Sequence, residues 1–174
     1  MRSPIIDLFI CALLLGVSAA PGLAGPFEEG EHAYLSGDYA GALRLLQPLA
    51  EDGHARAQGR LGTMFCKGEG VAANREEAIR WYRLAAEQGA PEAQFNLALK
   101  YDSGSRTTAD YSTAATWYRA AARQGLAEAQ NNLGAMYAAG KGVPQDFAIS
   151  VKWYRRAAEQ GMISAQTLLA WMYH

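Results

Sequence analysis

Residues 55–90 read ARAQGRLGTMFCKGEGVAANREEAIRWYRLAAEQGA, and residues 127–162 read AEAQNNLGAMYAAGKGVPQDFAISVKWYRRAAEQGM. The two stretches place an Ala-Gln pair, a Leu-Gly pair, a Gly-x-Gly-Val run, a Trp-Tyr pair and an Ala-Ala pair at the same positions. Residues 91–126, which lie between them, carry most of these pairs, so the chain repeats itself every 36 residues. A fixed period in the range of about 20–50 residues is the signature of an architecture built by stacking one supersecondary unit.

The same register extends beyond these stretches. The recurring positions are the Ala-Gln pairs at 57, 93, 129 and 165, the leucines at 61, 97, 133 and 169, the aromatic residues at 65, 101, 137 and 173, the Trp-Tyr pairs at 81, 117 and 153, and the glycines at 89, 125 and 161. Since so many positions keep one spacing, we divide the chain into repeats at 55–90, 91–126 and 127–162.

Each period contains two predicted helices. Asn74, Asp110 and Asp146 share one register position before an amphipathic run, where their side-chain oxygens can accept hydrogen bonds from a first helical turn. Glu77 lies three residues after Asn74, which is the spacing of a capping box. Each amphipathic run ends at a glycine, which can terminate a helix. The predicted second helices are 74–88, 110–124 and 146–160, and the predicted first helices are 56–66, 92–102, 128–138 and 164–173. The pattern therefore predicts an all-α fold.

A small residue follows each recurring leucine in the predicted first helix. These residues are Gly62, Ala98, Gly134 and Ala170. Because glycine inside a helix costs up to about 1 kcal/mol relative to alanine, its recurrence predicts that a neighbouring backbone or a tryptophan ring lies against it. The Gly-x-Gly-Val run follows a helix rather than a strand and lacks the spacing of a phosphate-binding loop, so we interpret it as a structural turn.

The two ends of the chain differ from the repeats. Residues 1–24 resemble an export signal, with Arg2, an apolar run of ten residues at 8–17, and small residues before cleavage sites after Ala19 or Ala24. An uncleaved anchor is the alternative, but a membrane-spanning helix needs about 20 apolar residues. Residues 27–54 form a shortened first repeat, and residues 163–174 form a half repeat that caps the array. We expect a periplasmic or secreted protein with no stable membrane anchor after cleavage.

Composition narrows the function classes. The chain has 174 residues, 16 basic and 17 acidic, so no general positive field is available to bind nucleic acid. Cys66 is the only cysteine outside the leader, and we interpret it as a small buried hydrophobe. The three histidines are not paired at metal-ligand spacing, and no Ser-x-x-Lys, Gly-x-Ser-x-Gly or His-Glu-x-x-His motif occurs. We therefore expect neither catalysis nor a metal nor a cofactor.

The combined register resembles the Sel1-like repeat (SLR), a relative of the tetratricopeptide repeat. The resemblance covers about residues 27–174, although Ser105-Arg106-Thr107 departs from the family's glycine loop. It implies a right-handed α/α superhelix, or solenoid, whose first helices line a concave face, and a role as an adaptor, often in the bacterial envelope or in signalling complexes. Some exported relatives are rich in cysteine and have been associated with β-lactam binding or hydrolysis, which this chain's single mature thiol does not match.

The Trp-Tyr pairs should supply most of the buried surface between hairpins, since a two-helix unit cannot bury its own apolar stripe. We expect Trp117→Ala, in the central repeat, to unfold the array or split its melting transition.

Binding residues should lie at positions where the side chain differs from one repeat to the next. The resulting partner-binding candidates are Arg60, Thr63, Phe95, Asn96, Leu99, Asn131, Asn132 and Trp171.

Two further features allow alternatives. The glutamines at 58, 94, 130 and 166 fit either a hydrogen-bond ladder inside the stack or a row that contacts a ligand, and their strict recurrence favours the ladder. Trp171 in the terminal half repeat predicts an exposed apolar end that pairs with another copy or a partner's helix, although the helix can equally serve only as a cap.

We predict an exported, non-catalytic scaffold that binds a protein or peptide partner. The alternative is an envelope enzyme or a protein that binds β-lactams or the cell wall.

Overall fold

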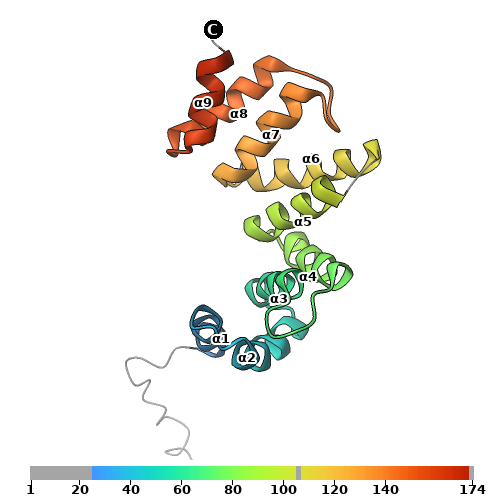
Figure 1. The fold of residues 1–174 in the computed structure, drawn as a ribbon, viewed down its shortest axis with the longest axis vertical. Helices are drawn as coiled ribbons and strands as arrows, with labels where there is room; N and C mark the ends of the chain where they lie inside the picture. The colour runs from blue at the N-terminus through green and yellow to red at the C-terminus, as the bar shows by residue number, and fades with distance from the viewer. Residues whose placement is uncertain (1–24, 105–106, 173–174) are drawn as a thin grey trace, which may run out of the picture.

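The computed structural model describes residues 25–104 and 107–172, and the predicted export signal lies outside them. Within these residues the chain is all-α, with nine helices and no strand (Figure 1). The helices are α1 (Pro26–Leu35), α2 (Tyr39–Glu51), α3 (Ala55–Lys67), α4 (Arg75–Glu87), α5 (Pro91–Gly104), α6 (Thr108–Arg123), α7 (Ala127–Ala139), α8 (Phe147–Glu159) and α9 (Ile163–Met172). No helix in the described part of the chain is both long enough and apolar enough to cross a bilayer.

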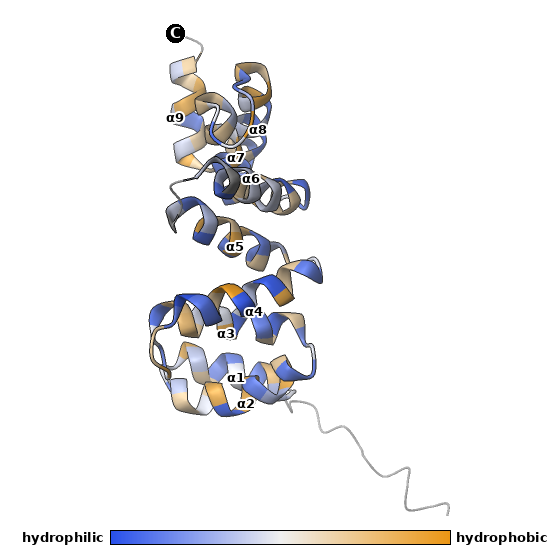
Figure 2. Ribbon diagram, turned by 90° about the vertical axis from the view of Figure 1, so that its right-hand side faces the viewer, coloured by the Kyte–Doolittle hydropathy of each residue, from blue (hydrophilic) through white to orange (hydrophobic). Residues whose placement is uncertain are grey.

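The helices stack as hairpins into a right-handed α/α solenoid. Each helix packs chiefly against the helix before it and the helix after it, so the molecule is a curved rod and not a ball around one core (Figure 1). Figure 2 shows apolar and polar residues mixed along the helices, as expected where each hairpin buries one face against the next. The predicted superhelix is confirmed.

Helix starts follow the predicted caps in two of the three full repeats. Asn74 accepts a hydrogen bond from the amide of Glu77 at 3.1 Å, and Asp146 accepts one from the amide of Ile149 at 2.8 Å. The prediction is wrong at Asp110, which lies inside the first turn of α6. Thr107, three residues earlier, is the cap, and its hydroxyl accepts the amide of Asp110 at 3.3 Å. The middle loop lacks the second glycine and offers this hydroxyl earlier, so α6 begins sooner.

The capping box predicted at Glu77 forms only in part. The backbone amide of Glu77 donates to the Asn74 side chain, which is one of the two hydrogen bonds of a capping box. The second is missing, because the amide of Asn74 donates to the carbonyl of Phe65 at 2.9 Å. The carboxylate of Glu77 instead pairs with Arg80 at 3.0 Å. The loop between α3 and α4 therefore takes the donor that a capping box would use.

Rings and glycines make the hairpins close-packed. The tyrosines Tyr82, Tyr118 and Tyr154 of the Trp-Tyr pairs are 3 %, 0 % and 3 % exposed. A Cβ added to Gly62 would lie 2.6 Å from the ring of Tyr82, and one added to Gly134 would lie 2.9 Å from the ring of Tyr154. The ring expected against these glycines is thus a tyrosine and not a tryptophan. Among the tryptophans of the pairs, Trp81 is buried, whereas Trp117 and Trp153 are half-buried.

Candidate functional site

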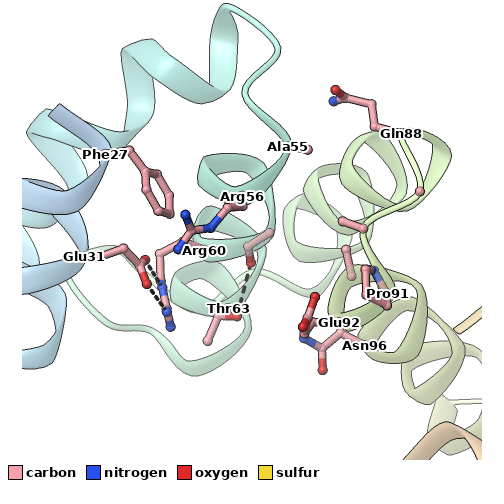
Figure 3. Close-up of a pocket in the computed structure, with 14 residues that line it drawn as sticks. Phe27, Glu31, Ala55, Arg56, Arg60, Thr63, Gln88, Pro91, Glu92 and Asn96 are labelled. Carbon is pink, nitrogen blue, oxygen red and sulfur yellow. Dashed lines mark hydrogen bonds and ion pairs between the residues drawn. The ribbon is translucent and has the colours of Figure 1, made fainter. Parts of the chain in front are cut away.

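A groove runs between the first helices of the first three hairpins. Side chains of α1, α3 and α5, together with the turn that joins α4 to α5, enclose a cavity of about 780 Å³ (Figure 3). These helices are the ones that the family resemblance assigns to the concave face. The groove therefore joins three consecutive hairpins at the N-terminal half of the rod.

Arg60 is held rigidly on the α3 wall of the groove. Its guanidinium donates from Nε and Nη2 to the two carboxylate oxygens of Glu31, each at 2.6 Å, and lies 4.2 Å from the ring centre of Tyr34. The hydrogen bonds to Glu31 raise the pKa of the Arg60 guanidinium above its usual value. A bidentate pair of this kind fixes both position and orientation of the guanidinium, so Arg60 presents its remaining N–H donors in one geometry.

The start of α3 carries a second, freer guanidinium. The guanidinium of Arg56 lies 4.2 Å from the ring centre of Phe27. Its ion pair with Glu28 is loose, because the nearest carboxylate oxygen is 3.9 Å away. His54 caps α3, its Nδ1 accepting the amide of Ala57 at 3.2 Å, and its ring stacks on Phe27 with centroids 4.7 Å apart. The loosely paired Arg56 is the groove cation that a bound segment could engage at least structural cost.

The opposite wall is the N-terminal half of α5. Figure 3 shows Glu92 and Asn96 on this wall, across the groove from Arg56 and Arg60. Glu92 is exposed and Asn96 is half-buried. One wall therefore offers two guanidinium groups and the Glu31 carboxylate that pairs with one of them, and the other offers a carboxylate and an amide. Such a groove suits a polar main chain with charged side chains better than a purely apolar ligand.

The structure brings only some of the predicted binding residues together. Arg60, Thr63 and Asn96 all line the groove. Phe95 and Leu99 are half-buried and pack against the core between α5 and α7, with the ring centre of Phe95 5.7 Å from that of Tyr118. Their contacts are those of packing residues.

The other predicted residues lie farther along the rod. Asn131 donates to Asn132 at 3.3 Å and accepts the hydroxyl hydrogen of Ser164 at the same distance. Trp171 lies on α9 at the far end and is 75 % exposed. The eight residues thus form no single site, and a partner-binding role for each of them stays a prediction.

The recurring glutamines form the predicted internal ladder. Gln58, Gln94 and Gln130 are buried, and each donates to a carbonyl eight residues earlier at 3.0–3.1 Å. Each also accepts a hydrogen bond from a second glutamine 30 residues later in the chain. The second row is Gln88, Gln124 and Gln160, whose donor-to-acceptor distances are 2.7, 2.9 and 2.9 Å. The exposed Gln166 makes the equivalent bond to the carbonyl of Ala158 at 3.2 Å.

Sequence reasoning missed several groove residues. Phe27 and Glu31 come from the shortened first repeat, which has no full register to mark its variable positions. Glu92 could have been found, because Arg56, Glu92 and Glu128 share a register position and differ in charge. The second glutamine row was also visible in the register at 88, 124 and 160.

Cys66 and the acidic and histidine side chains were the remaining candidates for a metal or redox site. Cys66 is a free, half-buried thiol, and Lys100 Nζ donates to its sulfur at 2.8 Å. Across residues 25–104 and 107–172, no group of three or more His, Cys, Asp or Glu side chains is placed to hold a metal ion.

A rod of stacked two-helix hairpins with a groove on its first-helix side defines a helical-repeat protein. The Sel1 repeat profile matches residues 55–89, 91–126 and 127–162, and the chain belongs to the Sel1 repeat family. Sel1 repeats typically mediate protein–protein interactions. No curated protein sequence matches the chain significantly.

Solved structures of relatives agree with this assignment. A protective antigen of uropathogenic Escherichia coli that displays an SLR fold is 35 % identical over 85 % of this chain and 32 % of its own, with a TM-score of 0.80. A Sel1 repeat protein from Oxalobacter formigenes is 36 % identical over 83 % of this chain and 59 % of its own, with a TM-score of 0.77. The chain thus spans about a third and three-fifths of these relatives. Helicobacter pylori cysteine rich protein B, 20 % identical over 85 % of this chain and 99 % of its own, shares the fold with a TM-score of 0.55.

Proposed function

We propose that this protein is an exported, non-catalytic scaffold that binds an extended segment of a protein partner in the groove between α1, α3 and α5. The observation that carries the proposal is the groove itself, which spans three hairpins and is lined at Arg56, Glu92 and Asn96 by residues that the repeat does not dictate. A side chain that varies while its register neighbours recur is available for recognition, since it is not needed for stacking.

The chemistry of the two walls suggests the kind of segment. Arg56, which is only loosely paired, favours a carboxylate on one side, whereas Glu92 favours a basic side chain on the other. Arg60, whose charge Glu31 balances, offers its remaining N–H donors to an uncharged acceptor. The segment bound would therefore be a peptide that carries both signs of charge, and its main-chain amides would find a partner in the side-chain amide of Asn96.

In-cell cross-linking tests this function. A photoreactive amino acid placed at position 96 should capture a specific polypeptide, and Glu92→Lys should reduce the yield severalfold because it reverses the charge of the α5 wall. The control places the same amino acid at Lys152, an exposed position of α8 outside the groove. Equal capture at positions 96 and 152, insensitive to Glu92→Lys, would contradict the groove.

Export is the second part of the proposal, and it rests on the pattern of residues 1–24. Amino-terminal sequencing of the protein from cell fractions should find it in the periplasm or the medium, beginning at residue 20 or residue 25. A full-length chain in the cytoplasm would contradict export.

An envelope enzyme or a β-lactam- or wall-binding protein is the alternative, and it rests on the resemblance to the cysteine-rich relatives. Hydrolysis of a chromogenic β-lactam by the purified protein, abolished by one polar substitution in the groove, would replace the scaffold with this alternative.

A further inference from the structure

Gly59 is a glycine inside α3 that the packing of the hairpin does not require. Among the described residues, no atom lies within 4 Å of a Cβ added at Gly59, whereas a Cβ added at Gly62 would meet the ring of Tyr82. Glycine inside a helix lowers stability relative to alanine, so its presence here calls for another reason. Gly59 lines the groove. Its missing side chain therefore leaves space in the groove.

The next repeat fills the equivalent space with two apolar side chains. Phe95 is the register equivalent of Gly59, and Leu126 is the register equivalent of Ala90, which lines the groove from the turn between α4 and α5. Both Phe95 and Leu126 pack against one core cluster, and the ring centre of Phe95 lies 5.7 Å from that of Tyr118. Compared with that repeat, the groove lacks a benzyl group at one position and most of a leucine side chain at the other.

The third repeat also carries larger side chains at these two positions. They are Asn131, which accepts the hydroxyl hydrogen of Ser164 at 3.3 Å, and Met162, which packs against the cluster around Tyr154. Of the three full repeats, only residues 55–90 combine a glycine with an alanine there. We call the part of the groove beside Gly59 and Ala90 the Gly59 pocket.

Opposite charges flank the Gly59 pocket. Arg56 lies one helical turn before Gly59 on α3, and Glu92 lies two residues after Ala90 on α5. Figure 3 shows these two charged residues on opposite walls of the groove. A peptide that places one side chain in the pocket would therefore gain most from an acidic residue on one side of it and a basic residue on the other.

We propose that the Gly59 pocket takes an aromatic side chain of the bound segment, whose ring replaces the one that Phe95 supplies in the next repeat. An aromatic side chain buries about 150–250 Å², and one such ring in a pocket commonly anchors an interface. The inference rests on the proposed function and adds its specificity. The segment recognised carries an aromatic residue between an acidic and a basic residue.

A library of random decapeptides displayed on phage tests the proposal. Peptides selected on the purified protein should share an aromatic residue that has an acidic neighbour on one side and a basic neighbour on the other. A fluorescent copy of one selected peptide should bind at least tenfold more weakly when alanine replaces its aromatic residue. This comparison uses the unmodified protein, so it does not depend on the folding of any variant.

Filling the pocket from the protein side should have the same effect. The double variant Gly59→Phe and Ala90→Leu carries the two side chains that the next repeat already accommodates, and it should bind the fluorescent peptide at least tenfold more weakly. A thermal melt shows whether this variant is folded. Thr167→Phe is the matched control, because it places a phenyl ring at the same register position of α9, exposed and outside the groove. It should bind the peptide as the parent does.

The outcomes separate the pocket from the groove. Selected peptides that share no aromatic residue, or aromatic peptides that bind the double variant as tightly as the parent, would overturn the pocket. The groove would still stand if Glu92→Lys weakened the binding of those peptides. If no peptide is selected, or if Glu92→Lys leaves the binding of every selected peptide unchanged, the groove is contradicted and the pocket with it.

Discussion

Gly62 and Gly134 have no side chain, and the ring of a tyrosine from the next helix fills the space that a Cβ would occupy. The close approach lets Tyr82 and Tyr154 become almost fully buried. In the middle repeat Ala98 takes the glycine's place beside Tyr118, and both are fully buried. Within each repeat, one small residue on the first helix therefore makes room for one buried tyrosine on the second helix.

Replacing Gly62 by alanine should destabilise the protein by about 1–3 kcal/mol, because the new methyl group would lie 2.6 Å from the Tyr82 ring and must displace it. The matched control is Gly59→Ala on the same helix, where no atom lies within 4 Å of the new Cβ. That change should stabilise α3 by up to about 1 kcal/mol. Urea unfolding of the two variants measures the difference, and equal stabilities would contradict the proposed contact.

Burial makes Tyr82 sensitive to alkaline conditions. Desolvation raises the pKa of Tyr82 to about 12, although its hydrogen bond with Thr63 opposes the rise. In the unfolded chain the phenol ionises near pH 10, so between about pH 10 and 12 the unfolded state binds fewer protons than the folded state. Stability is therefore complete below pH 10 and falls as the pH rises toward 12.

The alkaline loss from Tyr82 should be on the order of 2 kcal/mol. Tyr82→Phe should remove that share of the loss while leaving the contributions of other buried tyrosines in place. Urea unfolding at pH 9 and pH 11.5 measures it. A decline of the same size in the parent and in Tyr82→Phe would contradict the assignment.

At the scale of helices, paired glutamines tie each hairpin to the one before. Gln94 donates to the carbonyl of Ala86 on α4 and accepts from Gln124 at the end of α6, which also donates to the carbonyl of Gly89. One buried amide thus connects three helices, and backbone carbonyls that end each second helix gain a donor. Buried amides of this kind are stable only when all partners are present.

Gln94→Ala should cost about 1–3 kcal/mol, because it leaves the Ala86 carbonyl buried without its donor. Gln166→Ala is the matched control, since Gln166 makes the equivalent bond to Ala158 at an exposed position, where water can replace it. Thermal unfolding should show a clear decrease for the first variant and almost none for the second. Similar midpoints for both would contradict the role of the ladder.

Much of the helix layout was predictable from sequence, since capping residues and closing glycines act locally. Asn74 and Asp146 begin helices as expected, whereas Asp110 does not, because Thr107 offers a hydroxyl three residues earlier. The groove was less predictable. It depends on how α1 sits against α3, and the pairing of Glu31 with Arg60 across 29 residues leaves no mark in the repeat register.

At the scale of the whole molecule, each hairpin is stabilised by its neighbours. The buried cores meet along the rod, and Phe65, Tyr101 and Trp117 each contact two of them. In a solenoid of this kind, stability is approximately a sum of repeat and nearest-neighbour terms. A defect at the centre should therefore uncouple the two ends. The half-burial of Trp117 makes Tyr118, the fully buried ring beside it, the more sensitive position for this test.

The far-ultraviolet thermal melt of Tyr118→Ala tests whether rings packed between successive hairpins hold the rod together. Truncating this ring should cost about 3–5 kcal/mol, so we expect a strongly lowered midpoint or a transition split into two, with the smaller change for Trp117→Ala. Leu35→Ala, an exposed control, should melt like the parent. A Tyr118→Ala melt that superimposes on that of the parent would show that this ring does not hold the hairpins together.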